Sequence, residues 1–155
     1  MLASLDQSAF AQWLLGSNSI WAYPTVLTLH TFGMMVLVGA ALMVDLRLLG
    51  FGRAIPLGSM GRLFGVMWGA FWLNLVTGTM LFIADATKRA TQPLFLVKLA
   101  LVALGIVTIV LIKRSMFDGR EDPVVIPGSA KRLAIASLLV WCAAVTSGRL
   151  LAYVG

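Results

Sequence analysis

Charged side chains are scarce in this sequence: Asp, Glu, Lys and Arg make up only 12% of its 155 residues, whereas 60% are hydrophobic. A soluble domain usually carries about twice that share of charge. The few charges gather in residues 47–62, 85–89 and 113–132, and between these segments lie apolar runs of about 20 residues, long enough to cross about 30 Å of hydrocarbon as α-helices. The sequence therefore predicts an all-α integral membrane protein.

Cysteine and histidine each occur once, as Cys142 and His30. A single cysteine excludes an intrachain disulfide and a CxxC metal site. The sequence also lacks an HExxH helix, a glycine-rich phosphate loop and a plausible Ser–His–Asp set, so we predict no catalytic residues. The net charge of +6 comes without a basic face carrying interleaved aromatics, so we expect the lipid bilayer, and no nucleic acid, as a partner.

Four membrane-spanning helices in one domain covering residues 1–155 account for the apolar runs. We expect spans at about residues 20–49, 62–84, 94–112 and 133–154, separated by segments that contain Pro56, Pro93, Pro123 and Pro127. The fold class is thus a membrane four-helix bundle. Residues 1–17 contain apolar positions at helical spacing and are expected to form a short amphipathic helix lying in the membrane interface.

The distribution of Lys and Arg predicts the orientation. One side of the membrane would hold Arg47, Arg53, Arg62, Lys113, Arg114, Arg120, Lys131 and Arg132, and the other would hold Lys88, Arg89, Lys98 and Arg149. The richer side should be cytoplasmic. We therefore expect a multi-pass protein of a bacterial inner membrane with both termini in the periplasm.

The second expected span contains small residues at four-residue spacing, namely Gly61, Gly65 and Gly69. Such a doubled GxxxG pattern lets two helices approach closely. The pattern is compatible with packing inside the bundle, and it is also compatible with a homo-oligomer or with docking on a partner membrane subunit.

His30 is the leading candidate for a functional residue, because it lies inside the first span and polar side chains in hydrocarbon usually face the bundle interior. Matching depths places Thr77, Thr146 and Ser147 opposite it. His30 could simply form a hydrogen bond with one of these hydroxyls. It could also ligate a metal or haem, or it could handle protons or another ligand.

Two cofactors would suit an intramembrane imidazole. Copper(I) favours imidazole and thioether ligands, so Met34 and Met80 join His30 as candidate metal ligands. Haem b usually takes two axial side chains, whereas this chain has one histidine. A five-coordinate haem, a His30–Met80 pair or a haem shared by two chains would each be compatible with that number.

Four further charged residues lie near span ends. Asp45 is expected to pair with Arg62, Lys113 or Arg132, and Asp85 with Lys88 or Arg89 one turn away. Lys98 and Arg149 are each expected about one turn inside the outer interface. They could reach outward to water, or they could converge as a cofactor-binding site for the anionic groups of a quinone, haem or lipid.

Several stretches of the sequence resemble a known family. They are residues 95–101 (FLVKLAL), residues 74–82 (NLVTGTMLF), the spacing His30…Gly33…Gly39, and residues 147–149 (SGR). Together they resemble a group of bacterial four-helix inner-membrane proteins and, among named families, the membrane domain of copper-resistance D. That resemblance implies a site near His30 that binds copper or haem for metal handling or electron transfer. The alternatives are a non-catalytic structural or accessory subunit of a larger membrane complex, and a small transporter or channel.

Overall fold

The computed structural model describes residues 7–16, 21–118 and 126–154 of the chain. The elements over these residues are helical: α2 (Ala9–Gly16), α3 (Ala22–Leu49), the short 3-10 helix η1 (Gly58–Met60), α4 (Gly61–Ala84), α5 (Ala86–Thr91), α6 (Pro93–Met116) and α7 (Gly128–Val154). Helices α3, α4, α6 and α7 are long and apolar enough to cross a membrane, which confirms the four predicted spans and the all-α class.

The helix boundaries differ from the predicted spans mainly beside the last loop. Helix α6 continues to Met116 rather than to residue 112, and α7 begins at Gly128 rather than at residue 133. The extra turns carry basic residues such as Lys113 and Lys131, which hydropathy removes from a span although they suit a helix. The predicted start of the first span at residue 20, Arg120 and Pro123 lie outside the described residues.

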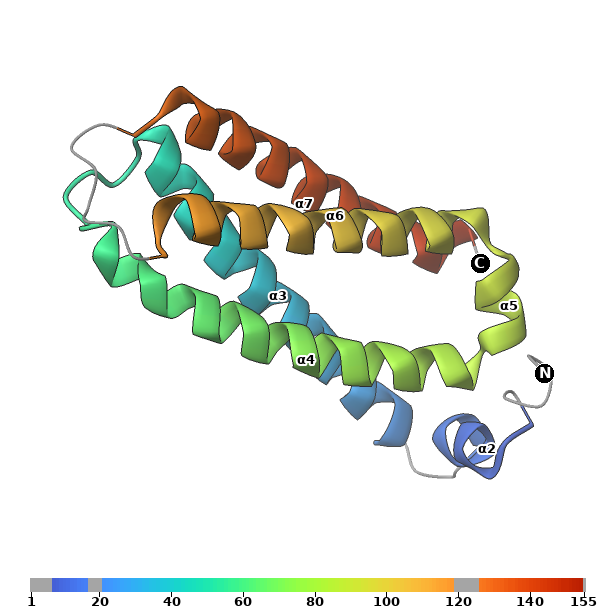
Figure 1. The fold of residues 1–155 in the computed structure, drawn as a ribbon. Coiled ribbons are helices and arrows are strands. Elements are labelled where there is room, and N and C mark those ends of the chain that lie inside the picture. Colours follow the sequence, from blue (N-terminus) through green and yellow to red (C-terminus); the bar gives the residue numbers. More distant parts are fainter. Residues whose placement is uncertain (1–6, 17–20, 119–125, 155) are drawn as a thin grey trace.

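The two short helices lie at the same end of the bundle. Helix α2 begins after Ser8, whose hydroxyl accepts a hydrogen bond from the Ala11 amide at 3.2 Å. Its buried side chains, Ala11 and Leu14, face the bundle, while residues 1–6 and 17 of the predicted interfacial helix lie outside the described residues. Helix α5, which joins α4 to α6 at this end, was not predicted from the sequence (Figure 1).

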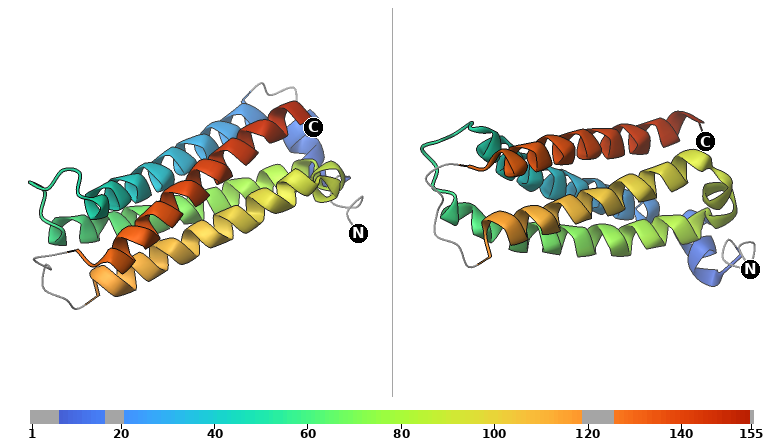
Figure 2. Two further views of the ribbon diagram at one scale, coloured as in Figure 1. Left: turned by 90° about the horizontal axis from the view of Figure 1, so that it is seen from above. Right: turned by 45° about the horizontal axis from the view of Figure 1, so that its top comes forward.

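The four long helices run alternately up and down and form two closely packed pairs. Helix α3 packs mainly on α4, α6 packs mainly on α7, and the pairs are joined chiefly along α3 and α7 (Figures 1 and 2). Helices α4 and α6 contact each other less. Two aromatic pairs lie at this junction: Phe82 stacks on Phe95 at 5.5 Å near α5, and Phe64 meets Phe117 edge-on at 4.9 Å near the opposite end.

Two apolar clusters of different size form the core. The larger draws on all four long helices and includes Leu37, Met67, Ile109 and Trp141. The smaller lies at the α5 end and joins Leu14 of α2 to Val26 and Ala84. His30 of α3 and Asn74 and Thr77 of α4 lie between these two clusters along their helices.

Each helix pair is fitted together by side chains that rest on glycines of the facing helix. A Cβ added at Gly33 of α3 would lie 2.5 Å from Asn74 Nδ2, and one at Gly78 of α4 would lie 3.1 Å from His30 Cε1. In the other pair, a Cβ at Gly105 would lie 2.7 Å from the Trp141 ring. These contacts require glycine because a methyl group would displace the facing side chain.

The glycine stripe of α4 has a different environment. No atom of the described residues lies within 4 Å of a Cβ built at Gly61, Gly65 or Gly69. The interpretation that this stripe serves packing inside the bundle is therefore wrong. The stripe faces outward because the packed face of α4 is made of larger buried residues, including Phe64, Met67 and Ala70.

Candidate functional site

His30 lies on α3 and points toward α4. Its Nδ1 atom is 3.0 Å from Thr77 Oγ1, which confirms the prediction that a hydroxyl on a facing helix lies within hydrogen-bond reach. The other two candidate hydroxyls bond to their own helix: Thr146 donates to Cys142 O at 2.8 Å, and Ser147 donates to Ala144 O at 2.9 Å. Thr77 therefore fixes the orientation of the imidazole.

The hydrogen bonds of Thr77 assign the tautomer of His30. The Thr77 hydroxyl oxygen lies 2.7 Å from Leu73 O and 3.0 Å from His30 Nδ1, so we assign its single proton to the shorter bond with the carbonyl and its lone pair to the histidine. Nδ1 must then carry the proton of the neutral ring, and Nε2 keeps its lone pair. The Asn74 backbone carbonyl is a further acceptor beside the ring, and no side chain of the described residues makes a hydrogen bond with Nε2. The site thus presents an oriented imidazole with a free basic nitrogen.

Asn74 adds a second polar side chain beside the imidazole. It lies one turn before Gly78 on α4, is 8% exposed, and donates from Nδ2 to Ala70 O at 3.0 Å. Its Oδ1 atom is buried without a hydrogen-bond partner. Gly33 leaves the room that Asn74 occupies, and Gly78 leaves the room for the imidazole.

Lys98 brings a positive charge to the same region from α6. Its side chain lies across Gly148 of α7, with Cε 3.3 Å and Nζ 3.6 Å from where a Cβ would be. The ammonium acts electrostatically on the His30 ring and on Arg89. The structure gives it no hydrogen bond and no carboxylate partner among the described residues. Lys98 is therefore a half-buried cation without a counter-ion near His30.

Arg149 is exposed and directed elsewhere. Its Nη2 atom lies 3.4 Å from Tyr153 Oη, and its guanidinium carbon lies 5.6 Å from the centre of the Tyr153 ring. No contact between Arg149 and Lys98 is seen in the described part of the chain. The structure thus places Lys98, rather than Arg149, in the electrostatic environment of His30.

The two candidate thioether ligands belong to different parts of the core. Met34 packs against the large cluster, and Met80 packs against the small cluster at the α5 end. No hydrogen bond joins either sulfur to His30 among those that the structure shows. Within the described ranges, no group of three or more His, Cys, Asp or Glu residues is placed to hold a metal ion.

Of the two ion pairs predicted for acidic residues, one is confirmed and the other is wrong. Asp85 pairs with Arg89 one turn away, at 3.7 Å. Asp45 was expected to pair with Arg62, Lys113 or Arg132, but its side chain is 1% exposed and neither carboxylate oxygen has a hydrogen-bond partner. Its position on α3 turns it toward Ser137 of α7 instead of toward the basic residues at the helix ends.

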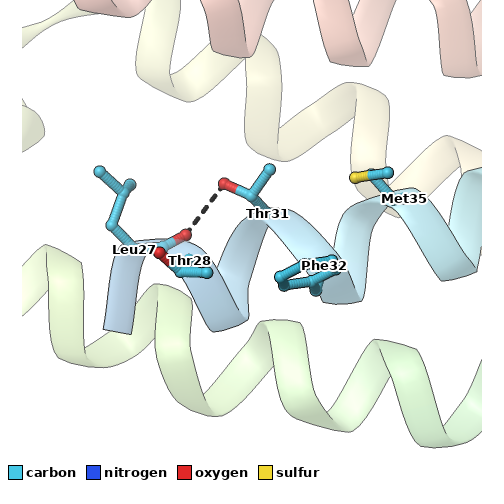
Figure 3. A pocket seen from close by; sticks show the side chains of 5 residues that line it. All are labelled: Leu27, Thr28, Thr31, Phe32 and Met35. Carbon is cyan, nitrogen blue, oxygen red and sulfur yellow. Dashed lines mark hydrogen bonds between the residues drawn. The ribbon is translucent and has the colours of Figure 1, made fainter. Parts of the chain in front are cut away.

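A separate hollow of about 220 Å³ lies on α3 itself, lined by Leu27, Thr28, Thr31, Phe32 and Met35 (Figure 3). The Thr31 hydroxyl is bonded to Leu27 O at 2.9 Å, and no lining residue carries a charge or a metal-binding nitrogen. This hollow does not include His30 and offers no comparable chemistry.

Sequence reasoning missed Asn74, Ser137 and Trp141, all of which have buried polar atoms without a partner. The sequence carries a signal for Asn74, because it precedes Gly78 by four residues and therefore lies on the same face of α4, the face that His30 contacts. Ser137 and Trp141 are also four residues apart on α7. A search for polar residues within apolar runs would have singled out these positions, but the burial of the Ser137 and Trp141 polar atoms depends on how α7 packs.

Comparison with known proteins identifies the family without assigning an activity. No curated protein and no solved structure matches the chain. One family model matches residues 15–154, which include all four spans, His30, Thr77 and Lys98. The chain belongs to that family, the family of unknown function DUF6644.

Proposed function

We propose that this protein binds haem b in the membrane, with His30 Nε2 as an axial ligand, and that it serves electron transfer. The observation that carries the proposal is the pair of hydrogen bonds made by Thr77, which leave Nε2 as the unprotonated nitrogen. Histidines that ligate metals usually donate their other ring N–H to an acceptor that fixes the ring. Thr77 Oγ1 is such an acceptor for the Nδ1–H of His30.

Lys98 supports haem over a bare metal ion. A haem carries propionate groups besides its iron, and an unpaired ammonium suits such a carboxylate. Lys98 is half-buried, lacks a carboxylate partner among the described residues and acts on the His30 ring. Arg149, at the same end of the bundle, is a second candidate for a propionate.

Copper is the weaker candidate on the same grounds. Copper(I) would need thioether ligands in addition to His30. Met34 and Met80 pack in separate apolar clusters, at opposite sides of His30 along the bundle. The resemblance to copper-resistance D remains the argument for copper, and a metal assay distinguishes it from haem.

We further propose that the protein lies in a bacterial inner membrane with both termini in the periplasm. The Lys and Arg asymmetry of the sequence supports this orientation. Under it, the α5 end is periplasmic and His30 lies in the periplasmic half of the bilayer. A haem there would be near the periplasmic surface, where a soluble electron carrier can approach.

The test is an optical spectrum with haem and copper quantified on the same purified protein. We expect a Soret band and close to one haem per one or two chains, the second ratio indicating a shared haem. His30→Ala should abolish the band while the helical circular dichroism stays unchanged. Purified protein that neither contains haem nor takes it up when haemin is added would overturn the proposal. Stoichiometric copper instead would assign the site to copper.

A structural role for His30 is the second candidate, and the hydrogen bond to Thr77 also favours it. In that case the protein is a non-catalytic subunit of a larger complex, and His30 only ties α3 to α4. His30→Gln separates the two candidates, because glutamine can donate to Thr77 but does not replace an imidazole on iron. Full stability and full complex assembly in His30→Gln, with no haem in the wild type, would favour this second candidate.

A further inference from the structure

A groove between α3 and α7 lies away from the α3–α4 contact of His30. It has a volume of about 310 Å³ and is lined by Val38, Leu42 and Asp45 of α3 together with Leu138, Trp141, Cys142, Val145 and Thr146 of α7. Binding sites for small molecules are typically of at least this size, mostly apolar, and contain a few convergent polar groups. The groove between α3 and α7 is likewise lined mostly by apolar side chains, with Asp45 as its charged member.

Three buried polar side chains in or beside the groove have no hydrogen-bond partner within the protein, whereas the lining Thr146 hydroxyl donates to its own helix. Both carboxylate oxygens of Asp45, the Ser137 hydroxyl oxygen and the Trp141 indole nitrogen are buried without a hydrogen bond. Ser137 is the polar neighbour of Asp45, but the two side chains do not meet the geometry of a hydrogen bond. Ser137 and Trp141 lie one turn apart on α7, so all three groups belong to one region of the α3–α7 interface.

A lone carboxylate in this position must be neutralised. Asp45 lies within the apolar span Ala22–Leu49 and is 1% exposed. Among the described residues, no charged side chain of α4, α6 or α7 pairs with it; Trp141 lines the groove with it, and Ser137 lies beside it beneath the groove surface. An ionised carboxylate without a counter-charge is very costly in hydrocarbon. It must therefore hold either a proton or a bound cation.

We propose that the α3–α7 groove binds a small organic cation with an apolar body, a protonated aryl-alkylamine in chemical class, and that this cation exchanges with a proton on Asp45. The ammonium group pairs with the Asp45 carboxylate and donates to its oxygens. The apolar body lies against Leu42, Leu138 and the Trp141 ring, whose face attracts cations. Binding releases one proton, so the site remains neutral in both states.

The inference does not rest on the haem site. Asp45 and His30 are about four turns apart on α3, and their side chains meet different helices: His30 meets Thr77 of α4, and Asp45 lies beside Ser137 of α7. Loss of haem binding in His30→Ala leaves the groove intact, and Asp45→Asn leaves the hydrogen bond between His30 and Thr77 intact. The two proposals therefore fail or succeed separately.

Calorimetry in nanodiscs of phosphatidylcholine tests the exchange. The probe is 2-phenylethylammonium, its uncharged counterpart is 2-phenylethanol, and empty nanodiscs supply the background for partition into lipid. Titrations at pH 7 in two buffers with different ionisation enthalpies give the number of protons released. We expect saturable binding of the ammonium with close to one proton released, and only lipid partition for the alcohol.

Asp45→Asn should weaken ammonium binding by roughly 30-fold or more and abolish proton release, because it removes the charge and keeps the size of the side chain. The matched control is Asp118→Asn, which removes an exposed carboxylate paired with Lys113 at 3.7 Å and should change neither quantity. Binding by Asp45→Asn at wild-type affinity would overturn the proposal. Binding by the wild type without proton release, or no binding beyond lipid partition, would also overturn it.

A chemical measurement on the unaltered protein guards against misfolding of the variant. Dicyclohexylcarbodiimide adds to a protonated carboxyl group in an apolar site and leaves a stable acylurea that mass spectrometry locates. We expect labelling at Asp45 in preference to Asp118, which is exposed, and Asp85, which is half-buried and paired with Arg89, and protection of Asp45 by saturating 2-phenylethylammonium. Labelling of Asp45 that the ammonium does not slow would show that the buried polar groups hold only water or a proton.

Discussion

The single histidine of this chain has a defined chemical state because of one neighbouring hydroxyl. Thr77 gives its proton to a backbone carbonyl of its own helix and is left able only to accept. His30 therefore donates from Nδ1, and Nε2 is left basic and unpaired. A threonine that bonds to the carbonyl four residues earlier is common in membrane helices. Its effect here depends on the imidazole that rests on the neighbouring Gly78.

Thr77→Val should expose the importance of this hydroxyl. Valine keeps the shape of threonine but leaves the Nδ1–H of His30 without its acceptor, so we expect a loss of about 1–3 kcal/mol in the free energy of unfolding. Reversible unfolding in mixed detergent micelles, followed by circular dichroism, measures the change. Thr79→Val is the matched control, because Thr79 makes the same bond to its own helix but is exposed. Equal stability of the two variants would contradict the assigned role of Thr77.

The two helix pairs, α3–α4 and α6–α7, pack in the same way. A side chain of one helix rests on a glycine of the other: His30 and Asn74 use Gly78 and Gly33, and Trp141 uses Gly105. In a membrane, helices gain little from the hydrophobic effect and associate through close packing and hydrogen bonds. Glycines beneath bulky or polar side chains allow this close packing. They also leave room for polar side chains such as His30 to form hydrogen bonds between helices.

Gly105→Ala tests this device in the α6–α7 pair. The new methyl group would lie 2.7 Å from the Trp141 ring, which is buried and cannot move without repacking. We expect destabilisation of about 1–3 kcal/mol in the same unfolding assay. Gly39→Ala serves as control because nothing lies within 4 Å of its Cβ, and it should stay within about 0.5 kcal/mol of the wild type. A stable Gly105→Ala variant would refute the proposed close packing.

The outward glycine stripe of α4 carries the prediction of self-association or of docking on a partner subunit. Gly65→Leu would block close approach of another helix while clashing with nothing in the chain itself, because its Cβ meets open space. We expect a shift to smaller particles in detergent by light scattering coupled to gel filtration. Gly39→Leu, on an equally open position of α3, should leave the particle size unchanged. An unchanged size in Gly65→Leu would exclude the stripe as the interface.

For the whole molecule, hydropathy and charge predicted the number and nature of the spans because the bilayer imposes both. The sequence also predicted that His30 meets a hydroxyl, since few polar groups were available at its depth. The partner of Asp45 was predicted wrongly because its rotation about α3, and not its closeness to basic residues in the sequence, decides what it faces. The buried Ser137 and Trp141 polar atoms depend on how α7 packs against α3, which single-helix patterns do not determine.

The orientation of the whole bundle in the membrane can be tested by cysteine labelling. A single cysteine placed at Ser129, with Cys142 replaced by alanine, should resist membrane-impermeant thiol reagents in intact cells and react after lysis, because the Lys and Arg excess puts this end in the cytoplasm. Ser129 is exposed in the first turn of α7, so the protein itself does not shield it. Labelling in intact cells would invert the topology and place His30 in the cytoplasmic half.

The central claim is that His30 presents a basic Nε2 to a ligand, and nitrogen-15 NMR of the histidine-labelled protein tests it most directly. Because the chain has one histidine, its two ring nitrogens give the only imidazole signals. In haem-free protein we predict a protonated Nδ1 and an unprotonated Nε2 at pH 7, with loss or a large shift of the Nε2 signal when haem is added. A proton on Nε2, or an Nε2 signal that haem leaves unchanged, would contradict the account.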